Sequence, residues 1–181
     1  MNRNRSGIIG ETAVLLKLLE QGFDAINLNS GIINYEGADL VCINPENGKM
    51  CQIQVKTCGK NQKNPLFPTG FTSDKHGTFN KDPHKEIKGP WVFVHTHGSC
   101  VEDYTYYILT KKEVTDLIID SNYWYTNIYN HKKELCDRNY PVCLYLSWIT
   151  GTDYDEKAKD YHSFKSKINR NPIDWKFIWE D

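Results

Sequence analysis

Two extended runs on either side of a strong turn constrain the fold of this chain more than any other feature. Residues 38–44 and 49–57 are rich in strand-forming side chains, and they flank Pro45-Glu46-Asn47-Gly48. Pro, Asn and Gly in so short a segment favour a tight connection between antiparallel strands. The sequence therefore predicts a β-hairpin over residues 38–57.

The second strand of this hairpin is predicted to carry one polar and one apolar face. Side chains alternate between faces along a strand, so Gln52, Gln54 and Lys56 share a face and the apolar residues between them share the other. A four-residue loop places Asp39 opposite Gln54, whereas a two-residue loop at positions 47 and 48 places it opposite Lys56. Both registers put Asp39 on the polar face.

A carboxylate is also expected on the inner face of the first helix. Residues 6–21 have helical periodicity, with Ser6 as the N-cap and Gly22 just beyond the end. The apolar face is expected to contain Ile8, Leu15, Leu18 and Leu19. Glu11 falls on the same face, where a charged side chain is unusual and indicates a role other than packing.

These residues form a set that can bind a hard metal ion. Asp39, Gln54 and Glu11 offer oxygen ligands, with Lys56 as an adjacent cation. Mg²⁺ takes oxygen ligands and retains several waters, so few protein ligands are needed. The backbone carbonyl of Val55 is a further candidate ligand.

In these positions the chain resembles the PD-(D/E)xK nuclease superfamily. The matching segments are Gly10-Glu11-Thr12, Gly37-Ala38-Asp39 and Gln54-Val55-Lys56. The resemblance covers roughly residues 7–57, with a looser match over 91–119. It implies an α/β fold with a restriction endonuclease-like three-layer core, in which helices flank a central mixed sheet. We expect a single nuclease-like domain over residues 1–181.

The resemblance also implies an activity. It predicts a metal-dependent endonuclease that hydrolyses phosphodiester bonds of nucleic acid, with DNA preferred, in restriction, defence or repair. Mg²⁺ is the expected cofactor, with Mn²⁺ as a substitute; Asp39, Gln54 and Val55 would bind it, assisted by Glu11, and Lys56 would be the catalytic cation. Because Gln54 replaces an acid, the alternative is an inactive nuclease-fold module that binds nucleic acid or another protein. Many members of the superfamily act as homodimers, but no dimer surface can be identified in this sequence.

Positive charge is concentrated in the middle of the chain. The net charge is −1, yet residues 56–88 carry seven basic and three acidic side chains. This segment is rich in Gly, Pro and Asn, so we expect a basic irregular loop over about 58–88. The lysines expected to contact the phosphate backbone are Lys60, Lys63, Lys75, Lys81, Lys85 and Lys88. A solvated loop without a ligand is the alternative interpretation.

The rest of the chain predicts further elements of an α/β protein. We expect strands over 23–28, 91–95, 104–109 and 142–149, and helices over 111–119 and 154–168. Six cysteines occur without a CxxC pair, which argues against a zinc module or a disulfide framework. The sequence has neither the apolar run of a membrane span nor that of a signal peptide, so we expect a cytoplasmic protein with no membrane partner.

Overall fold

The computed structural model describes residues 3–30, 37–59, 66–97, 100–129, 139–146, 168 and 171–180. The helices among these residues are α1 (Arg3–Glu20), α2 (Pro83–Glu86) and α3 (Lys111–Tyr123). The strands are β1 (Asp24–Asn27), β2 (Leu40–Ile43), β3 (Met50–Cys58), β4 (Phe67–Ser73), β5 (Trp91–His95), β6 (Thr105–Leu109) and β7 (Tyr140–Leu144). Short 3-10 turns lie at Leu28–Ser30, Val101–Asp103 and Trp175–Trp179, and a π-helical segment covers Trp124–Tyr129.

The chain divides into two compact units. The first contains Met1–Lys63, Lys88–Lys112 and Pro172–Asp181, and the second contains Asn64–Ile87 and Glu113–Asn171. The first unit holds a five-stranded sheet in the order β1-β2-β3-β5-β6. Strands β3 and β5 are parallel, and the other neighbouring pairs are antiparallel. This mixed sheet with packed helices confirms the α/β fold class.

The predicted hairpin forms with the register of a four-residue loop. Leu40 pairs with Ile53 and Ile43 pairs with Met50, while the Asn44 N–H donates to the Lys49 carbonyl at 2.8 Å. Gly48 ends the turn with a φ of 70°, which glycine adopts at low cost. Ile53 and Val55 are buried, whereas Gln52 is exposed and Gln54 half-buried. The two faces of β3 therefore differ as the alternation predicts.

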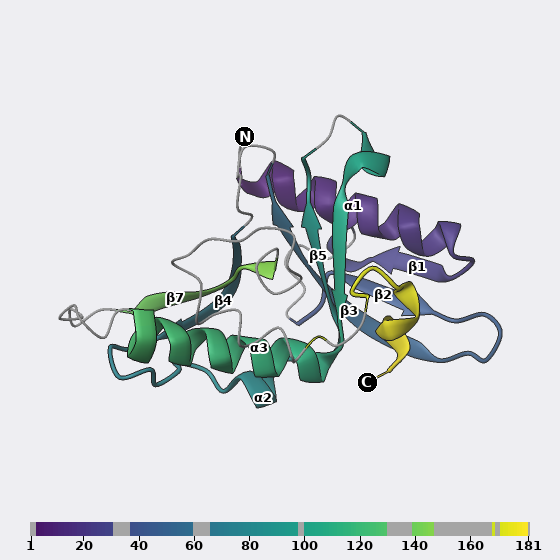
Figure 1. The fold of residues 1–181 in the computed structure, drawn as a ribbon. Helices are drawn as coiled ribbons and strands as arrows, with labels where there is room; N and C mark the ends of the chain where they lie inside the picture. Colours follow the sequence, from purple (N-terminus) through teal and green to yellow (C-terminus); the bar gives the residue numbers. More distant parts are fainter. Residues whose placement is uncertain are drawn as a thin grey trace. The chain divides into compact units, whose positions relative to one another are not determined.

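Helix α1 packs against the sheet through smaller side chains than expected. It lies across one face of the sheet and contacts β1 and β3 (Figure 1). The predicted N-cap Ser6 is inside the helix, which begins at Arg3. Two of the predicted core residues are wrong, since Ile8 is 62% exposed and Leu19 is 50% exposed. The side chains that α1 buries in the core of the first unit are Ala13, Val14 and Leu18.

The second unit contains a strand where we expected irregular chain. Strand β4 pairs with β7 in an antiparallel two-stranded sheet, with a register shift between Pro68 and Thr72. Its inward positions alternate with outward ones along the strand. Strand β7 spans Tyr140–Leu144, so it begins two residues before and ends five residues before the predicted strand over 142–149. The predicted helix over 154–168 lies almost entirely outside the described residues.

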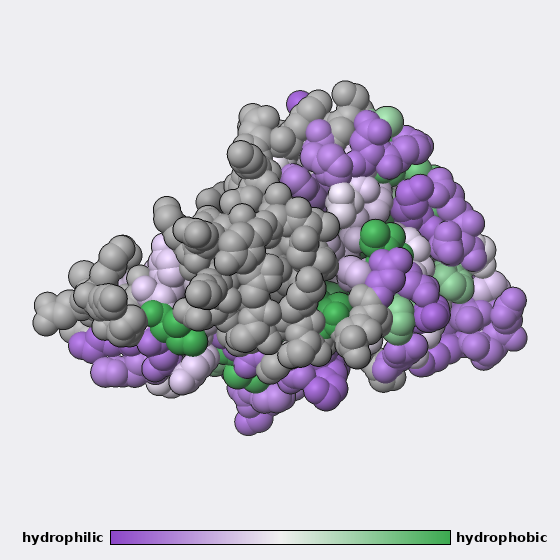
Figure 2. All heavy atoms as spheres, in the orientation of Figure 1, coloured by the Kyte–Doolittle hydropathy of each residue, from purple (hydrophilic) through white to green (hydrophobic). Residues whose placement is uncertain are grey.

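The described surface near the tip of the β2–β3 hairpin is mostly hydrophilic (Figure 2). This agrees with the exposure of Glu46, Asn47 and Lys49. None of the helices in the described part of the chain combines the length and the hydropathy needed to cross a membrane.

Candidate functional site

Asp39 lies immediately before β2, at the point where the pairing between β2 and β3 ends. The β2–β3 ladder ends at the Leu40–Ile53 pair, but β3 continues to Cys58. The Val55 N–H therefore lies beyond the last strand partner on this side. It donates to Asp39 Oδ2 at 2.7 Å, so the carboxylate replaces a backbone carbonyl as acceptor. This contact fixes the aspartate against the polar face of β3.

The Asp39 carboxylate also joins two side-chain amides. The Gln54 Nε2 donates to Asp39 Oδ2, and the Asn29 Nδ2 donates to Oδ1 at 3.0 Å. Because the nitrogen of the Gln54 amide faces Asp39, the amide oxygen is left as its acceptor end. Asp39 and Gln54, two of the predicted ligands, are therefore in direct contact.

Glu11 reaches the same cluster from α1. Its Oε2 accepts from Asn27 Nδ2 at 3.2 Å and from Asn29 Nδ2 at 3.3 Å. The Asn29 amide thus bridges the carboxylates of Glu11 and Asp39. Two like charges held this close repel each other, and a cation between them would relieve the repulsion.

A glycine allows the helix to come close enough for this bridge. A Cβ on Gly10 would lie 1.8 Å from Thr57 Oγ1, so only glycine fits between α1 and β3. The next residue along the helix is Glu11. The close approach of the α1 backbone to the Thr57 side chain therefore brings the glutamate to the start of β2, where Asn29 and Asp39 meet it.

Lys56 lies half-buried beside the carboxylates, with its ammonium above an aromatic ring. The Nζ is 5.1 Å from the centroid of the Trp91 ring, which attracts a cation electrostatically. Burial lowers the pKa of the Lys56 amine below its ordinary value, and the charges of Asp39 and Glu11 partly oppose that shift. Among the described residues, no carboxylate lies within 4 Å of this Nζ. The amine is near the acids without being locked in an ion pair.

The donor atoms of the cluster suit a hard cation. The atoms in question are carboxylate, carboxamide and backbone oxygens, which Mg²⁺ prefers over nitrogen or sulfur ligands. Asn29 Oδ1 is buried and has no hydrogen-bond partner within the described chain, and such an oxygen is costly unless a cation or a water meets it. Within the same residues, no three His, Cys, Asp or Glu side chains gather as a metal site, so this cluster has only two acids.

Asn27, Asn29 and Trp91 were not identified from the sequence. Asn27 ends β1, and its Oδ1 accepts from the Asn29 N–H at 2.8 Å, which shapes the 3-10 turn Leu28–Ser30. The spacing Asn27-Leu28-Asn29 at the end of a strand is the only signal the sequence offers for these amides. Trp91 pairs with Gln54 in the parallel β3–β5 ladder, so the pairing of these two strands is enough to place it at the site.

The predicted phosphate-contacting lysines fall in different parts of the structure. Lys60 and Lys63 lie outside the described residues. Lys75, Lys81 and Lys85 belong to the second unit, and the Lys85 amine is 3.9 Å from Asp82. Lys88 belongs to the first unit, immediately before β5. Lys88 is thus the one described member of this set that shares a compact unit with the candidate site.

Comparison with known proteins gives little further information. No protein-family model matches the chain, and neither does any curated protein. Among solved structures, the fold is similar to a bacterial homing endonuclease with a TM-score of 0.42 and 17% identity, over 61% of this chain and 67% of the other. A TM-score this low supports no functional conclusion.

Proposed function

We propose that this chain is a metal-dependent endonuclease that hydrolyses phosphodiester bonds of nucleic acid, with DNA as the preferred substrate. The observation that supports it is the contact of Glu11, Asp39 and Gln54 through one hydrogen-bonded network with Lys56 beside it. These residues come from three separate segments of the chain. The hydrophobic core does not require any of these polar side chains at its position.

The residues present fit a divalent ion of the Mg²⁺ type. Asp39 and the Val55 carbonyl would hold it, joined by the Gln54 amide oxygen once that amide, whose nitrogen faces Asp39, turns over, and Glu11 would hold one of its waters or a second ion. When bound, such an ion polarises the scissile phosphate and lowers the pKa of the attacking water. Asn29 would keep the two carboxylates at a fixed separation.

Lys56 is the group that can act on the reacting atoms. Its ammonium would stabilise negative charge that develops on the phosphate in the transition state, or orient the attacking water. The lowered pKa also makes the neutral amine more accessible than in an exposed lysine, so proton abstraction from water is within its range. The Trp91 ring lies against the Lys56 ammonium and limits the orientations that the lysine side chain can take.

Cleavage of supercoiled plasmid DNA with Mg²⁺ or Mn²⁺ tests this proposal. The wild type is expected to nick or linearise the plasmid, and Lys56→Ala and Asp39→Asn are expected to remove the activity while remaining folded. Lys112→Ala removes the same charge from an exposed position of the first unit and is expected to cut normally. Equal activity in all four proteins would rule the site out.

A second candidate function is a nuclease-fold module that binds nucleic acid without cutting it. Gln54 favours this alternative, because a carboxamide gives the ion less negative charge than the acid expected there. In that case DNA binding would not need Mg²⁺, and Gln54→Glu would create no cleavage. Cleavage by the wild type would exclude this alternative.

A further inference from the structure

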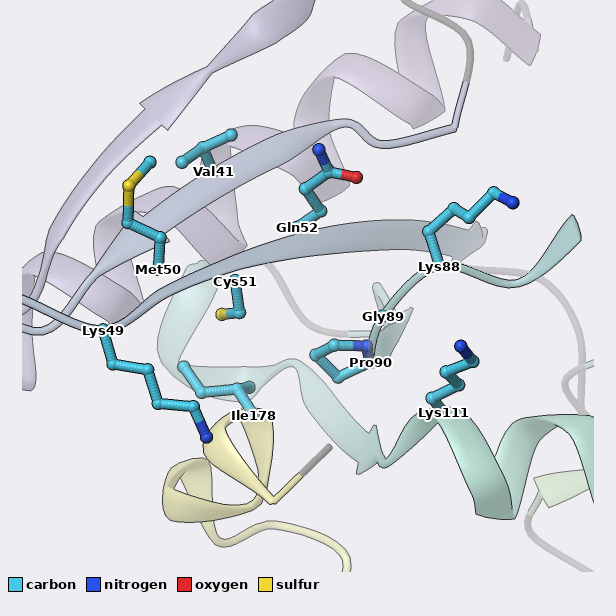
Figure 3. A pocket seen from close by; sticks show the side chains of 10 residues that line it. All are labelled: Val41, Lys49, Met50, Cys51, Gln52, Lys88, Gly89, Pro90, Lys111 and Ile178. Atoms are coloured by element: carbon cyan, nitrogen blue, oxygen red, sulfur yellow. The ribbon is translucent and has the colours of Figure 1, made fainter.

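A pocket of about 490 Å³ opens beside the candidate site in the first unit. Three lysines line it, and Figure 3 shows that they come from three different segments. Lys49 ends the hairpin turn, Lys88 precedes β5, and Lys111 begins α3. The other lining residues are Val41, Met50, Cys51, Gln52, Gly89, Pro90 and Ile178.

The pocket forms because β3 is longer than the strand beside it. The β3–β5 ladder begins at the Gln54–Trp91 pair, so in the described chain the preceding part of β3 has no strand partner on that side. Residues 88–90 approach this bare edge closely, since a Cβ on Gly89 would lie 2.2 Å from the Gln52 carbonyl oxygen. Gly89 therefore lets the segment that carries Lys88 pass next to Gln52.

The charge of the described pocket lining is positive. The ten lining residues that the structure describes include three lysines and no acid, in a chain whose net charge is −1. The Lys49 amine donates to the Trp179 carbonyl and points toward the C-terminal turn (Figure 3). Like-charged groups facing one hollow raise the local positive potential and attract anions.

The pocket lies around the free edge of β3 and reaches the face of the candidate metal ligands through Gln52, whereas Lys49 and Cys51 belong to the opposite face of that strand. Gln52 precedes Gln54 by two residues, so their side chains point to the same face at a separation of roughly 7 Å along the strand. Val41 lies opposite Gln52 on β2, just beyond Leu40 and Asp39. A nucleic-acid strand bound at Asp39 and Gln54 would thus reach the pocket with the next phosphate along its backbone.

We propose that the pocket lined by Lys49, Lys88 and Lys111 binds a backbone phosphate of the nucleic-acid strand next to the one held at Asp39 and Gln54. This inference rests on the proposed function, because it deepens the description of the same substrate. The Gln52 amide adds a neutral donor to the three ammonium groups. Phosphate contacts of this kind position a substrate and carry no sequence information.

Metal-free DNA binding tests the pocket separately from catalysis. A fluorescein-labelled 20-base-pair duplex is titrated with protein in EDTA at several salt concentrations, and fluorescence anisotropy gives the affinity. The test variant replaces Lys49, Lys88 and Lys111 with Gln, and the matched control replaces Lys17, Lys112 and Lys176 of the same unit with Gln. Both variants change the net charge equally, so a difference between them reports on position.

The pocket variant is expected to bind more weakly than the control, with a shallower dependence of affinity on salt. Each neutralised phosphate contributes about 0.9 to the slope of log K against log salt, so loss of the single pocket phosphate should make the slope shallower by about 0.9. Binding equal to that of the control, or no DNA binding by the wild type at low salt, would overturn the inference.

Cleavage assays separate this inference from the function on which it rests. If the pocket variant loses affinity while the wild type never cuts, the phosphate site stands and the nuclease proposal fails. If the wild type cuts and the pocket variant binds and cuts like the control, the nuclease proposal stands and the phosphate site fails.

Discussion

Replacing Asp39 with Ala or Asn separates its structural role from its proposed chemical role. In the Ala variant the Val55 N–H loses its acceptor, and a hydrogen bond to a charged group contributes about 1.5–3 kcal/mol. The amides of Asn29 and Gln54 also lose a partner, but both side chains are half-buried and can turn toward water. We therefore expect Asp39→Ala to reduce the free energy of unfolding by about 2–4 kcal/mol.

Asp39→Asn keeps one oxygen that can accept the Val55 N–H, so its expected cost is only about 1 kcal/mol. The melting temperature should fall by roughly 4–16 °C for the Ala variant and 2–4 °C for the Asn variant. Urea unfolding, followed by both circular dichroism and tryptophan fluorescence, measures the free energies. If both variants are as stable as the wild type, the carboxylate is not the acceptor that fixes β3, and the reasoning fails.

Three further substitutions probe the surroundings of Asp39. Gly10→Ala should destabilise the protein by about 1–3 kcal/mol in urea unfolding, because its Cβ would overlap Thr57. Gly7→Ala, whose Cβ would meet its nearest atom at 3.9 Å, should instead stabilise α1 by about 0.5–1 kcal/mol, and the opposite ranking would contradict the proposed close approach. Burial lowers the pKa of the Lys56 amine, so below that pKa the charged amine reduces the free energy of unfolding of the wild type. Lys56→Met removes this amine and should therefore stabilise the protein at low pH. The unfolded chain binds more protons between the lowered pKa and the ordinary value of 10.5, and the advantage of Lys56→Met should therefore shrink as the pH rises through that window. Urea unfolding at pH 7 and pH 10 measures this difference, and a pH-independent difference would show that the amine is not desolvated.

The hairpin could be predicted because local rules determine it. The turn at residues 45–48 allows two loop lengths, and with either of them alternation along β3 puts Asp39 on the polar face. The structure selects the four-residue loop, which places Asp39 opposite Gln54. Strand β5 was also predicted with its correct bounds, since Pro90 precedes a short run of buried residues.

The remainder of the site depends on contacts that no periodicity encodes. Asn29 connects Glu11 and Asp39, yet its position follows from a 3-10 turn that an Asn27 side chain stabilises. The orientation of α1 was also predicted incorrectly in part. Large aliphatic residues suggested one face, but the approach at Gly10 turns a face of smaller residues toward the sheet.

Strand β4 was not predicted because polar residues occupy buried positions. Its sequence contains Pro68 and Gly70, and few aliphatic side chains mark its inward face. Thr69 and Ser73 are nevertheless buried, since the Thr69 hydroxyl donates to the Val142 carbonyl at 2.7 Å and the Ser73 hydroxyl donates to Asn122 at 2.6 Å. Hydrogen bonds with distant residues thus replace the apolar alternation by which strands are recognised.

Mn²⁺ binding to the folded protein tests the central claim most directly. Isothermal titration of the wild type should reveal a Mn²⁺ site for which Mg²⁺ competes, and Asp39→Asn should lose it while keeping its fold. Binding of Mn²⁺ to the Asp39→Asn variant with unchanged affinity would show that the ion, if the protein holds one, lies elsewhere.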